Sequence, residues 1–244
     1  MAQFTFLNSF VKSFRISTYL SCMNNYLESV ERAFSANADN DIARKQASYM
    51  RDQFSFFGLK SPVRRELARP FLAKANLPSK EELDTIVKTL WQKPERELQY
   101  FAMELCAKYL RKAEHADIEL FEFMVVTKSW WDTVDFIAST LIGNYFKNFP
   151  NEIAPKVDDW LVSGDIWLQR SAILFQLKYK DQTNEELLAE VIRTMLGSQE
   201  FFINKAIGWA LREYSKFNPE WVANFADKAK LSGLSRREAL RLIK

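Results

Sequence analysis

The stretch "FIASTLIGNY", Phe136 to Tyr145, recurs along the chain in altered form and decides the fold. Aligned on its alanine, it matches "YFAMELCAKY" from Tyr100, "RSAILFQLKY" from Arg170 and "NKAIGWALRE" from Asn204. The aligned alanines are spaced by 36, 34 and 34 residues, at Ala102, Ala138, Ala172 and Ala206. A weaker copy aligns on Ala239. The chain is therefore built from repeats of about 35 residues.

Apolar residues follow these alanines at helical spacing. Three places after each alanine stand Leu105, Leu141, Phe175, Trp209 and, in the weaker copy, Leu242. A small residue where helices cross, followed by such a column, is typical of stacked helix pairs that share one core. Only six glycines and seven prolines occur in 244 residues, which disfavours many short strands and turns. We predict an all-α fold, an α-solenoid of HEAT-like repeats with a concave binding groove. The period is close to that of tetratricopeptide repeats, but their signatures are not repeated in register.

Several short motifs mark where helices begin. Proline or a capping side chain stands at Ser61-Pro62, Pro94, Asp165, Ser198 and Asn218-Pro219. Two further stretches, Ser129 to Asp132 and Ser235 to Glu238, fit the capping-box pattern, which predicts an N-cap at each serine.

The composition excludes several kinds of chemistry. His115 is the single histidine, which excludes a Ser-His-Asp triad and multi-histidine metal sites. The two cysteines are far apart, and no glycine-rich nucleotide-binding motif occurs, so we expect no cofactor and no metal. The net charge of +3 is too small to indicate a nucleic-acid-binding protein by itself. The basic C-terminal stretch "SRREALRLIK" fits either a nucleic-acid contact or an ordinary solvated helix face.

Residues 1–22 differ from the rest of the chain. They contain two basic residues, no acidic residue, several serines and four phenylalanines, while Met23 opens a normal helical pattern. This segment is interpreted as either a targeting leader or the product of a start codon assigned too early. No apolar run approaches the roughly 18 residues of a membrane span. We expect a soluble, cytoplasmic protein with one domain over residues 23–244.

The repeat containing Trp131 and Asp135 departs from the others. Seven places before the alanine, the other repeats carry polar residues, whereas this one carries the indole of Trp131. Three places before the alanine, the column is mostly polar, which predicts that Asp135 faces a groove or surface. The two residues are four apart and so share one helix face. Asp132 is assigned to helix capping and Trp130 to packing.

Two further residues leave more than one interpretation open. Arg170 occupies a column with two aromatic residues and an asparagine, so its guanidinium either binds a ligand or pairs with a local acid. Trp209 occupies the apolar column and, by the repeat pattern alone, is assigned to the core.

Four stretches resemble one known family over about nine-tenths of the chain, from Met23 onward. They are "ASYMRDQFSFFGLKSPVRR" from Ala47, "VTKSWWDTVDFI" from Val126, "DIWLQRSAILFQLKYK" from Asp165 and "EFFINKAIGWALREYSKFNP" from Glu200. In this order and spacing they resemble the AlkD-like DNA alkylation repair family, the HEAT-like-repeat DNA glycosylases. The resemblance implies hydrolysis of the N-glycosidic bond of cationic N7- and N3-alkylated purines in duplex DNA, by a monomeric protein.

The resemblance also implies roles for individual residues. The catalytic carboxylate is expected at Asp135, with the indoles of Trp131 and Trp209 beside the lesion. For Trp209 this implication replaces the core assignment. The DNA contacts are expected at Arg170, Arg212, Lys128 and Tyr49. Two other classes of protein stay open: a non-catalytic solenoid that binds damaged or branched DNA, and a helical-repeat scaffold that binds other proteins.

Overall fold

The computed structural model describes residues 23–243, and the segment 1–22 discussed above lies outside the described residues. Within the described part, all regular elements are helices, apart from one isolated bridge between Ser55 and Glu95. The helical content agrees with the all-α prediction. The described part of the chain divides into two compact units, residues 23–108 and 109–243.

The first unit contains a helix over residues 23–35 and then a series of labelled helices. These are α2 (Asn40–Tyr49), α3 (Ser61–Ala68), the short η1 (Lys74–Asn76) and η2 (Lys80–Glu82), α4 (Leu83–Gln92) and α5 (Arg96–Ala107). Edge-to-face contacts among aromatic rings, including those of Phe34 and Phe101, form part of its core.

A buried carboxylate fixes the loop before α3. Glu97 accepts hydrogen bonds from the backbone N–H groups of Phe57, Gly58 and Leu59 at 2.9 to 3.0 Å. Gly58 has a φ of +92°, and a Cβ there would lie 2.0 Å from the carbonyl oxygen of Asp39. Only glycine fits this close approach of the loop to α2.

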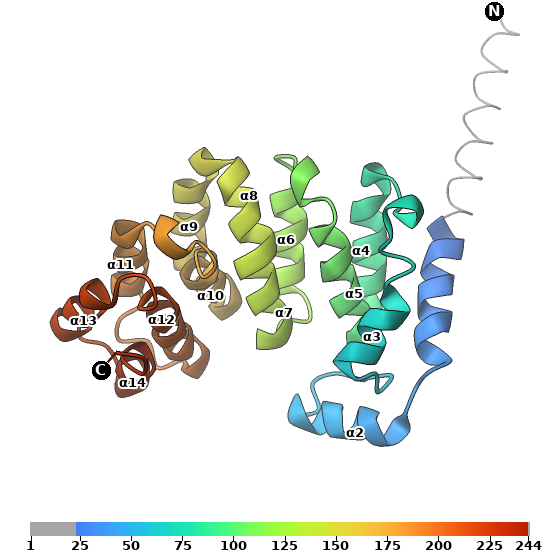
Figure 1. Ribbon diagram of the computed structural model, residues 1–244, viewed down its shortest axis with the longest axis horizontal. Coiled ribbons are helices and arrows are strands. Elements are labelled where there is room, and N and C mark those ends of the chain that lie inside the picture. Colours follow the sequence, from blue (N-terminus) through green and yellow to red (C-terminus); the bar gives the residue numbers. More distant parts are fainter. Residues whose placement is uncertain (1–22, 244) are drawn as a thin grey trace, which may run out of the picture. The chain divides into compact units, whose positions relative to one another are not determined.

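The second unit carries the three residues expected to act in catalysis, Trp131, Asp135 and Trp209, and contains the longer series of helices. Its elements are η3 (Leu110–Lys112), α6 (Asp117–Val126), α7 (Trp131–Phe136), the π-helix η4 (Ile137–Ile142), α8 (Gly143–Asn148), η5 (Pro150–Glu152), α9 (Ile153–Val162), α10 (Ile166–Leu174), η6 (Lys180–Gln182), α11 (Glu185–Thr194), α12 (Phe201–Tyr214), α13 (Pro219–Lys228) and α14 (Gly233–Ala239). In Figure 1 these helices follow one another in chain order from α6 to α14.

One row of helices organises the second unit. The segment α7–η4–α8 packs against α10, α10 packs against α12, and α12 packs against α14. We call these helices the site row. The aligned alanines of the row lie at or near zero exposure, as does Ala102 in the first unit. The prediction that small residues mark the helix crossings is therefore confirmed.

The apolar column is confirmed at three positions and wrong at two. Leu105, Leu141 and Phe175 are buried. Leu242 is 53% exposed because α14 ends at Ala239, so the last repeat has no helical turn to carry Leu242 into the core. Trp209 is half-buried and is not part of the core that the column predicted.

Helix starts follow the sequence signals in part. Asp165 caps α10 by accepting from the N–H groups of Trp167 and Leu168, and Asn218 caps α13. Both predicted capping boxes are wrong. Ser232, not Ser235, caps α14, and the hydroxyl of Ser235 donates instead to the carbonyl of Asn204.

The second capping error lies beside the candidate site. The hydroxyl of Ser129 donates to the carbonyl of Val125 at the end of α6, and α7 begins two residues later, after Trp130. The serine therefore terminates the preceding helix and does not start the next one.

Close packing of α12 and α14 depends on Gly208. A Cβ at Gly208 would lie 2.5 Å from the Cβ of Glu238 and 2.9 Å from the carbonyl oxygen of Ser235. Alanine normally stabilises a helix interior relative to glycine. Here we expect the clash to dominate, so Gly208→Ala should lower the free energy of unfolding by about 1–3 kcal/mol, measured by urea denaturation.

The matched control is Gly233→Ala in α14. Its Cβ would meet only the Nη1 atom of Arg237, at 3.9 Å, so stability should change little. If the Gly208 variant is as stable as the wild type, α12 and α14 can move apart to accommodate the added methyl group without a loss of folding free energy.

Candidate active site

The predicted catalytic carboxylate forms a buried ion pair. Nε and Nη2 of Arg170 donate to Oδ1 and Oδ2 of Asp135, at 2.7 and 3.0 Å. The side chain of Arg170 is 4% exposed and that of Asp135 is 17% exposed. The remaining Nη1 of Arg170 donates to the backbone carbonyl of Phe202. One guanidinium thus ties α7, α10 and the start of α12 together.

Burial sets the protonation behaviour of Asp135. Desolvation is the largest influence and raises the pKa of the carboxyl above its ordinary value. The hydrogen bonds and positive charge of Arg170 oppose this rise, and the neighbouring Asp132 adds to it. A two-point contact with a guanidinium favours the ionised carboxylate, which has about four lone-pair positions and uses two of them here.

Repeat comparison shows why Asp135 is unusual. In the corresponding positions, the amides of Gln99 and Gln169 donate to backbone carbonyls at the ends of α4 and α9. A carboxylate cannot donate in this way, and in this repeat Ser129 supplies the bond to the end of α6. Gln99 is buried, so the polar character of the column does not by itself place its residues at a groove or surface. Asp135 therefore does not bind the end of the preceding helix as the glutamines do, and its side chain remains partly exposed.

A change of helical pitch follows Asp135 directly. The π-helix η4 begins at Ile137, and the hydroxyl of Ser139 donates to the backbone carbonyl of Asp135 at 2.7 Å. Single π-helical turns within α-helices occur frequently at functional sites. Nothing in the repeat pattern predicted this segment.

The indoles near Asp135 differ in environment. Trp131 is the first residue of α7, half-buried, and lies one turn before Asp135. Trp130 packs against Trp167 and Phe202, with ring centroids 5.7 and 5.2 Å apart, as its packing assignment predicted. Its Nε1 atom is buried without a hydrogen-bond partner among the described residues. Trp209 lies on α12, two turns after Phe202.

The predicted DNA-contacting residues are placed differently from one another. Arg170 pairs with Asp135, which was the alternative left open by the sequence. Arg212 pairs with Glu238 of α14, which also binds Lys205 at 2.7 Å. The hydrogen bond from Lys205 is the largest influence that lowers the pKa of Glu238.

Lys128 and Tyr49 lie outside the helices of the site row. Lys128 stands in the turn before α7 with a φ of +48°, an uncommon conformation for a residue other than glycine. Tyr49 ends α2 in the first unit and is 71% exposed. The structure thus brings Asp135 and Arg170 into direct contact and places Trp131 on the same helix as Asp135.

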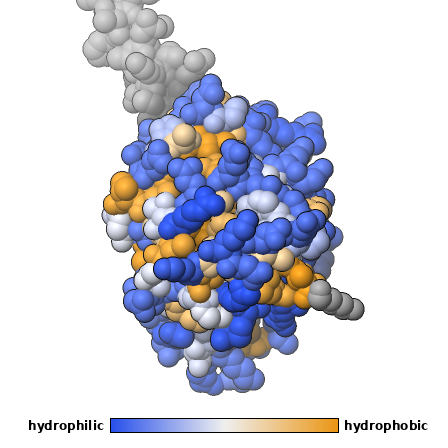
Figure 2. Space-filling view, turned by 90° about the vertical axis from the view of Figure 1, so that its left-hand side faces the viewer, coloured by the Kyte–Doolittle hydropathy of each residue, from blue (hydrophilic) through white to orange (hydrophobic). Residues whose placement is uncertain are grey.

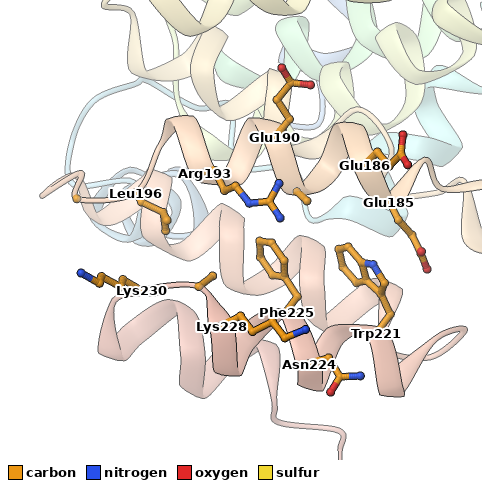
Figure 3. Close-up of a pocket in the computed structure, with 13 residues that line it drawn as sticks. Glu185, Glu186, Glu190, Arg193, Leu196, Trp221, Asn224, Phe225, Lys228 and Lys230 are labelled. Atoms are coloured by element: carbon orange, nitrogen blue, oxygen red, sulfur yellow. The ribbon is translucent and has the colours of Figure 1, made fainter.

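A cleft of about 1250 Å³ lies elsewhere, between α11 and α13. Figure 3 shows Trp221 and Phe225 projecting from α13 toward α11. Their rings are stacked at 5.2 Å, with the guanidinium of Arg193 5.6 Å from the centre of the Phe225 ring. No residue expected to act in catalysis lines this cleft. The candidate site therefore lies outside this cleft.

The fold and this geometry define a helical-repeat protein with a carboxylate and a buried arginine paired beside half-buried indoles. The chain belongs to the family of DNA alkylation repair enzymes, whose model matches residues 30–243. Among solved structures, it is similar to a predicted DNA alkylation repair enzyme from Enterococcus faecalis. The two are 33% identical with a TM-score of 0.79, over 84% of this chain and 96% of the other. A comparison with curated proteins found no match.

Family membership assigns the protein to DNA repair, with DNA as its partner. None of the helices in the described part of the chain combines the length and the hydrophobicity needed to span a membrane.

The raised pKa of Asp135 predicts a particular pH dependence of stability. When the folded pKa lies above the unfolded one, the stabilising contribution is complete below the unfolded pKa and is lost as pH rises through the folded pKa. The free energy of unfolding of the wild type minus that of Asp135→Asn should therefore fall as pH is raised from about 3 to about 7. Urea denaturation at a series of pH values measures it. If this difference in the free energy of unfolding instead grows with pH, the lowering of the Asp135 pKa by Arg170 outweighs its raising by desolvation.

Proposed function

We propose that the protein is a DNA glycosylase that hydrolyses the N-glycosidic bond of cationic N7- and N3-alkylated purines in duplex DNA. The observation that carries the proposal is the carboxylate of Asp135, held at both oxygens by a buried arginine, partly exposed, and on one helix face with Trp131. The family of DNA alkylation repair enzymes supports the substrate class.

The charge of the substrate explains why few catalytic groups are needed. An alkylated purine is a cation, so its departure from C1′ takes the bonding electron pair and neutralises the base. No general acid has to protonate the leaving group, which fits a site whose described residues include no histidine. The reaction then needs stabilisation of the positive charge that develops on the sugar.

Asp135 is suited to this task. Two lone-pair positions of its carboxylate remain after Arg170 has taken two, and these can face the sugar cation and an attacking water. Water adds its oxygen to C1′, the bond from C1′ to the base breaks, and the water releases one proton. A preorganised charge of this kind is worth several kcal/mol in a desolvated site. Indole faces add about 1–2 kcal/mol each by cation–π contact.

Arg170 acts in this proposal as a positioning residue. Its guanidinium fixes both carboxylate oxygens and favours their ionised state against the desolvation that raises the pKa. With three of its N–H groups engaged and its side chain 4% exposed, it has little surface left for a phosphate. This role differs from the DNA-backbone contact expected from the sequence.

A non-catalytic DNA-binding solenoid is the second candidate, since the same fold supports binding alone. A protein-binding scaffold would need an extended apolar surface. Figure 2, which looks onto the side of the molecule at the left of Figure 1, shows mostly hydrophilic side chains with separate hydrophobic patches. That face therefore does not favour the scaffold.

Replacement of the carboxylate by an amide tests the catalytic role. Asp135→Asn should reduce release of 7-methylguanine and 3-methyladenine from methylated duplex DNA by roughly 100- to 1,000-fold. Its affinity for DNA should equal or exceed that of the wild type, because a negative charge beside a polyanion is removed. Single-turnover base release and fluorescence anisotropy measure the two quantities.

Asp132→Asn is the matched control, because it removes one carboxylate from the first turn of the same helix. It should retain most of the excision rate. Parallel loss of binding and excision in the Asp135 variant would refute its catalytic role, and salt-sensitive binding without excision by the wild type would favour the non-catalytic solenoid.

The mechanism also predicts selectivity by charge. In duplexes of identical sequence, cationic 7-methylguanine should be released much faster than the neutral lesions uracil and 8-oxoguanine, because only the cation leaves as a neutral base. The measurement is the single-turnover rate for each lesion. Release of uracil at a comparable rate would contradict the proposed source of catalysis.

A further inference from the structure

The basic residues of the site row fall into two groups. Arg170, Lys205 and Arg212 each pair with a carboxylate. Lys178, in the turn after α10, has no carboxylate within ion-pair distance among the described residues, and its ammonium donates to the hydroxyl of Thr140 in η4. The ammonium also lies 5.7 Å from the centre of the Phe136 ring. This charge is held in place but not neutralised.

Its position relates directly to the candidate site. Phe136 follows Asp135 in sequence, and Thr140 lies about one turn of the π-helix beyond it. Lys178 lies eight residues after Arg170, about two helical turns further along the chain. The ammonium thus lies alongside the helix of Asp135, on the side facing α10.

The surroundings favour binding of an anion. Contact with Phe136 and Thr140 partly desolvates the ammonium, which lowers the pKa of Lys178. Because the charge is not neutralised, the binding of an anion would stabilise it. A second lysine contacts the same turn, since Nζ of Lys147 in α8 lies 4.6 Å from the ring centre of Tyr179, the residue after Lys178.

Tyr179 is fixed to α8. Its hydroxyl donates to the carbonyl of Gly143 at 2.7 Å. A Cβ at Gly143 would lie 2.6 Å from the carbonyl oxygen of Phe175, so the end of α10 approaches α8 closely here. The two lysines are therefore carried by a rigid junction and not by a mobile loop.

The repeat register gives an independent argument. Six places after the aligned alanines stand Lys108, Asn144, Lys178 and Arg212. Three of the four are basic. Of the two basic ones in the site row, Arg212 is neutralised by Glu238, whereas Lys178 is bound only by a hydroxyl. A cation thus stands at this fixed spacing after three of the four alanines, and at Lys178 no carboxylate neutralises it.

We propose that Lys178, held by Thr140 and supported by Lys147, binds a backbone phosphate of the DNA next to the Asp135 site. This proposal rests on DNA as the ligand of the site, as in the proposed function, and adds a phosphate subsite to it. The subsite fixes the backbone relative to the carboxylate and carries no base specificity, as expected for a phosphate contact.

The test is the salt dependence of binding to an unmodified, fluorescein-labelled duplex. Each phosphate contact contributes about 0.9 to the slope of log K against log salt concentration. Lys178→Gln should reduce the slope by about that amount and weaken binding at low salt, whereas Lys178→Arg should keep both. Thr140→Val, which frees the ammonium without removing its charge, should weaken binding less than Lys178→Gln.

Lys228→Gln is the control that also removes one positive charge. Lys228 lies on α13, in the wall of the cleft between α11 and α13. It should leave the slope unchanged. An unchanged slope for Lys178→Gln, or an equal change for both glutamine variants, would overturn the phosphate subsite.

Excision of methylated bases is measured separately on the same proteins. A wild type that releases no base but shows the slope change at Lys178 would retain the subsite and lose the glycosylase proposal. If the wild type releases methylated bases but Lys178→Gln leaves the salt slope unchanged, the glycosylase proposal stands and the phosphate subsite is refuted.

Discussion

The ion pair between Asp135 and Arg170 is the constraint on which the candidate site depends. It joins two helices of the site row through two hydrogen bonds, and the third bond of Arg170 reaches the carbonyl of Phe202 on another. Burying two charges costs several kcal/mol in desolvation, which their attraction offsets only when the geometry is good. Apolar side chains of similar volume would hold these helices together as well. The pair is therefore better explained by the need for a fixed carboxylate than by the needs of the fold.

The cations on and next to the helices of the site row differ in their partners, and this difference separates them by role. Arg212 and Lys205 bind one carboxylate, Glu238, and so connect α12 to α14 where Gly208 lets the helices approach closely. These charges stabilise the stack of repeats. Within the described part of the chain, Lys178 has only a hydroxyl and an aromatic ring as partners. Its charge is therefore not neutralised there, and an incoming anion would be its strongest partner. Arg212 and Lys178 occupy the same register position, which thus serves structure in one repeat and, in our proposal, phosphate binding in the other.

The repeat pattern predicted the features that follow from packing. The aligned alanines are buried because helices that cross closely accept only small side chains there, and this requirement recurs in every repeat. Local signals were weaker. The serines at 129 and 235 fit a capping pattern, yet each donates to a backbone carbonyl, because the end of the preceding helix offers Ser129 a partner and a tertiary contact with α12 offers one to Ser235. A pattern that describes one helix cannot reveal the end of its neighbour.

The site was predictable only where it departed from the repeat. Trp131 and Asp135 were found because other repeats place polar or amide side chains in those columns, but the partner of Asp135 could not be read from the sequence, since Arg170 is 35 residues away. The π-helix after Phe136 left no signal in the spacing. The sequence does carry a signal at Lys178, because the column six places after the alanine holds basic residues in three repeats, but this signal does not reveal which of them lacks a carboxylate partner.

The position of the site outside the cleft between α11 and α13 fits the proposed chemistry. A glycosylase that identifies a neutral lesion has to read the base in a pocket, because the base itself offers no advantage as a leaving group. A cationic purine leaves readily once the sugar is stabilised, so discrimination can come from the reaction and not from enclosure of the base. What the protein then has to supply is a carboxylate fixed against the sugar and a backbone fixed against the carboxylate. The first is met by Asp135 held by Arg170, and the second is the role we assign to Lys178.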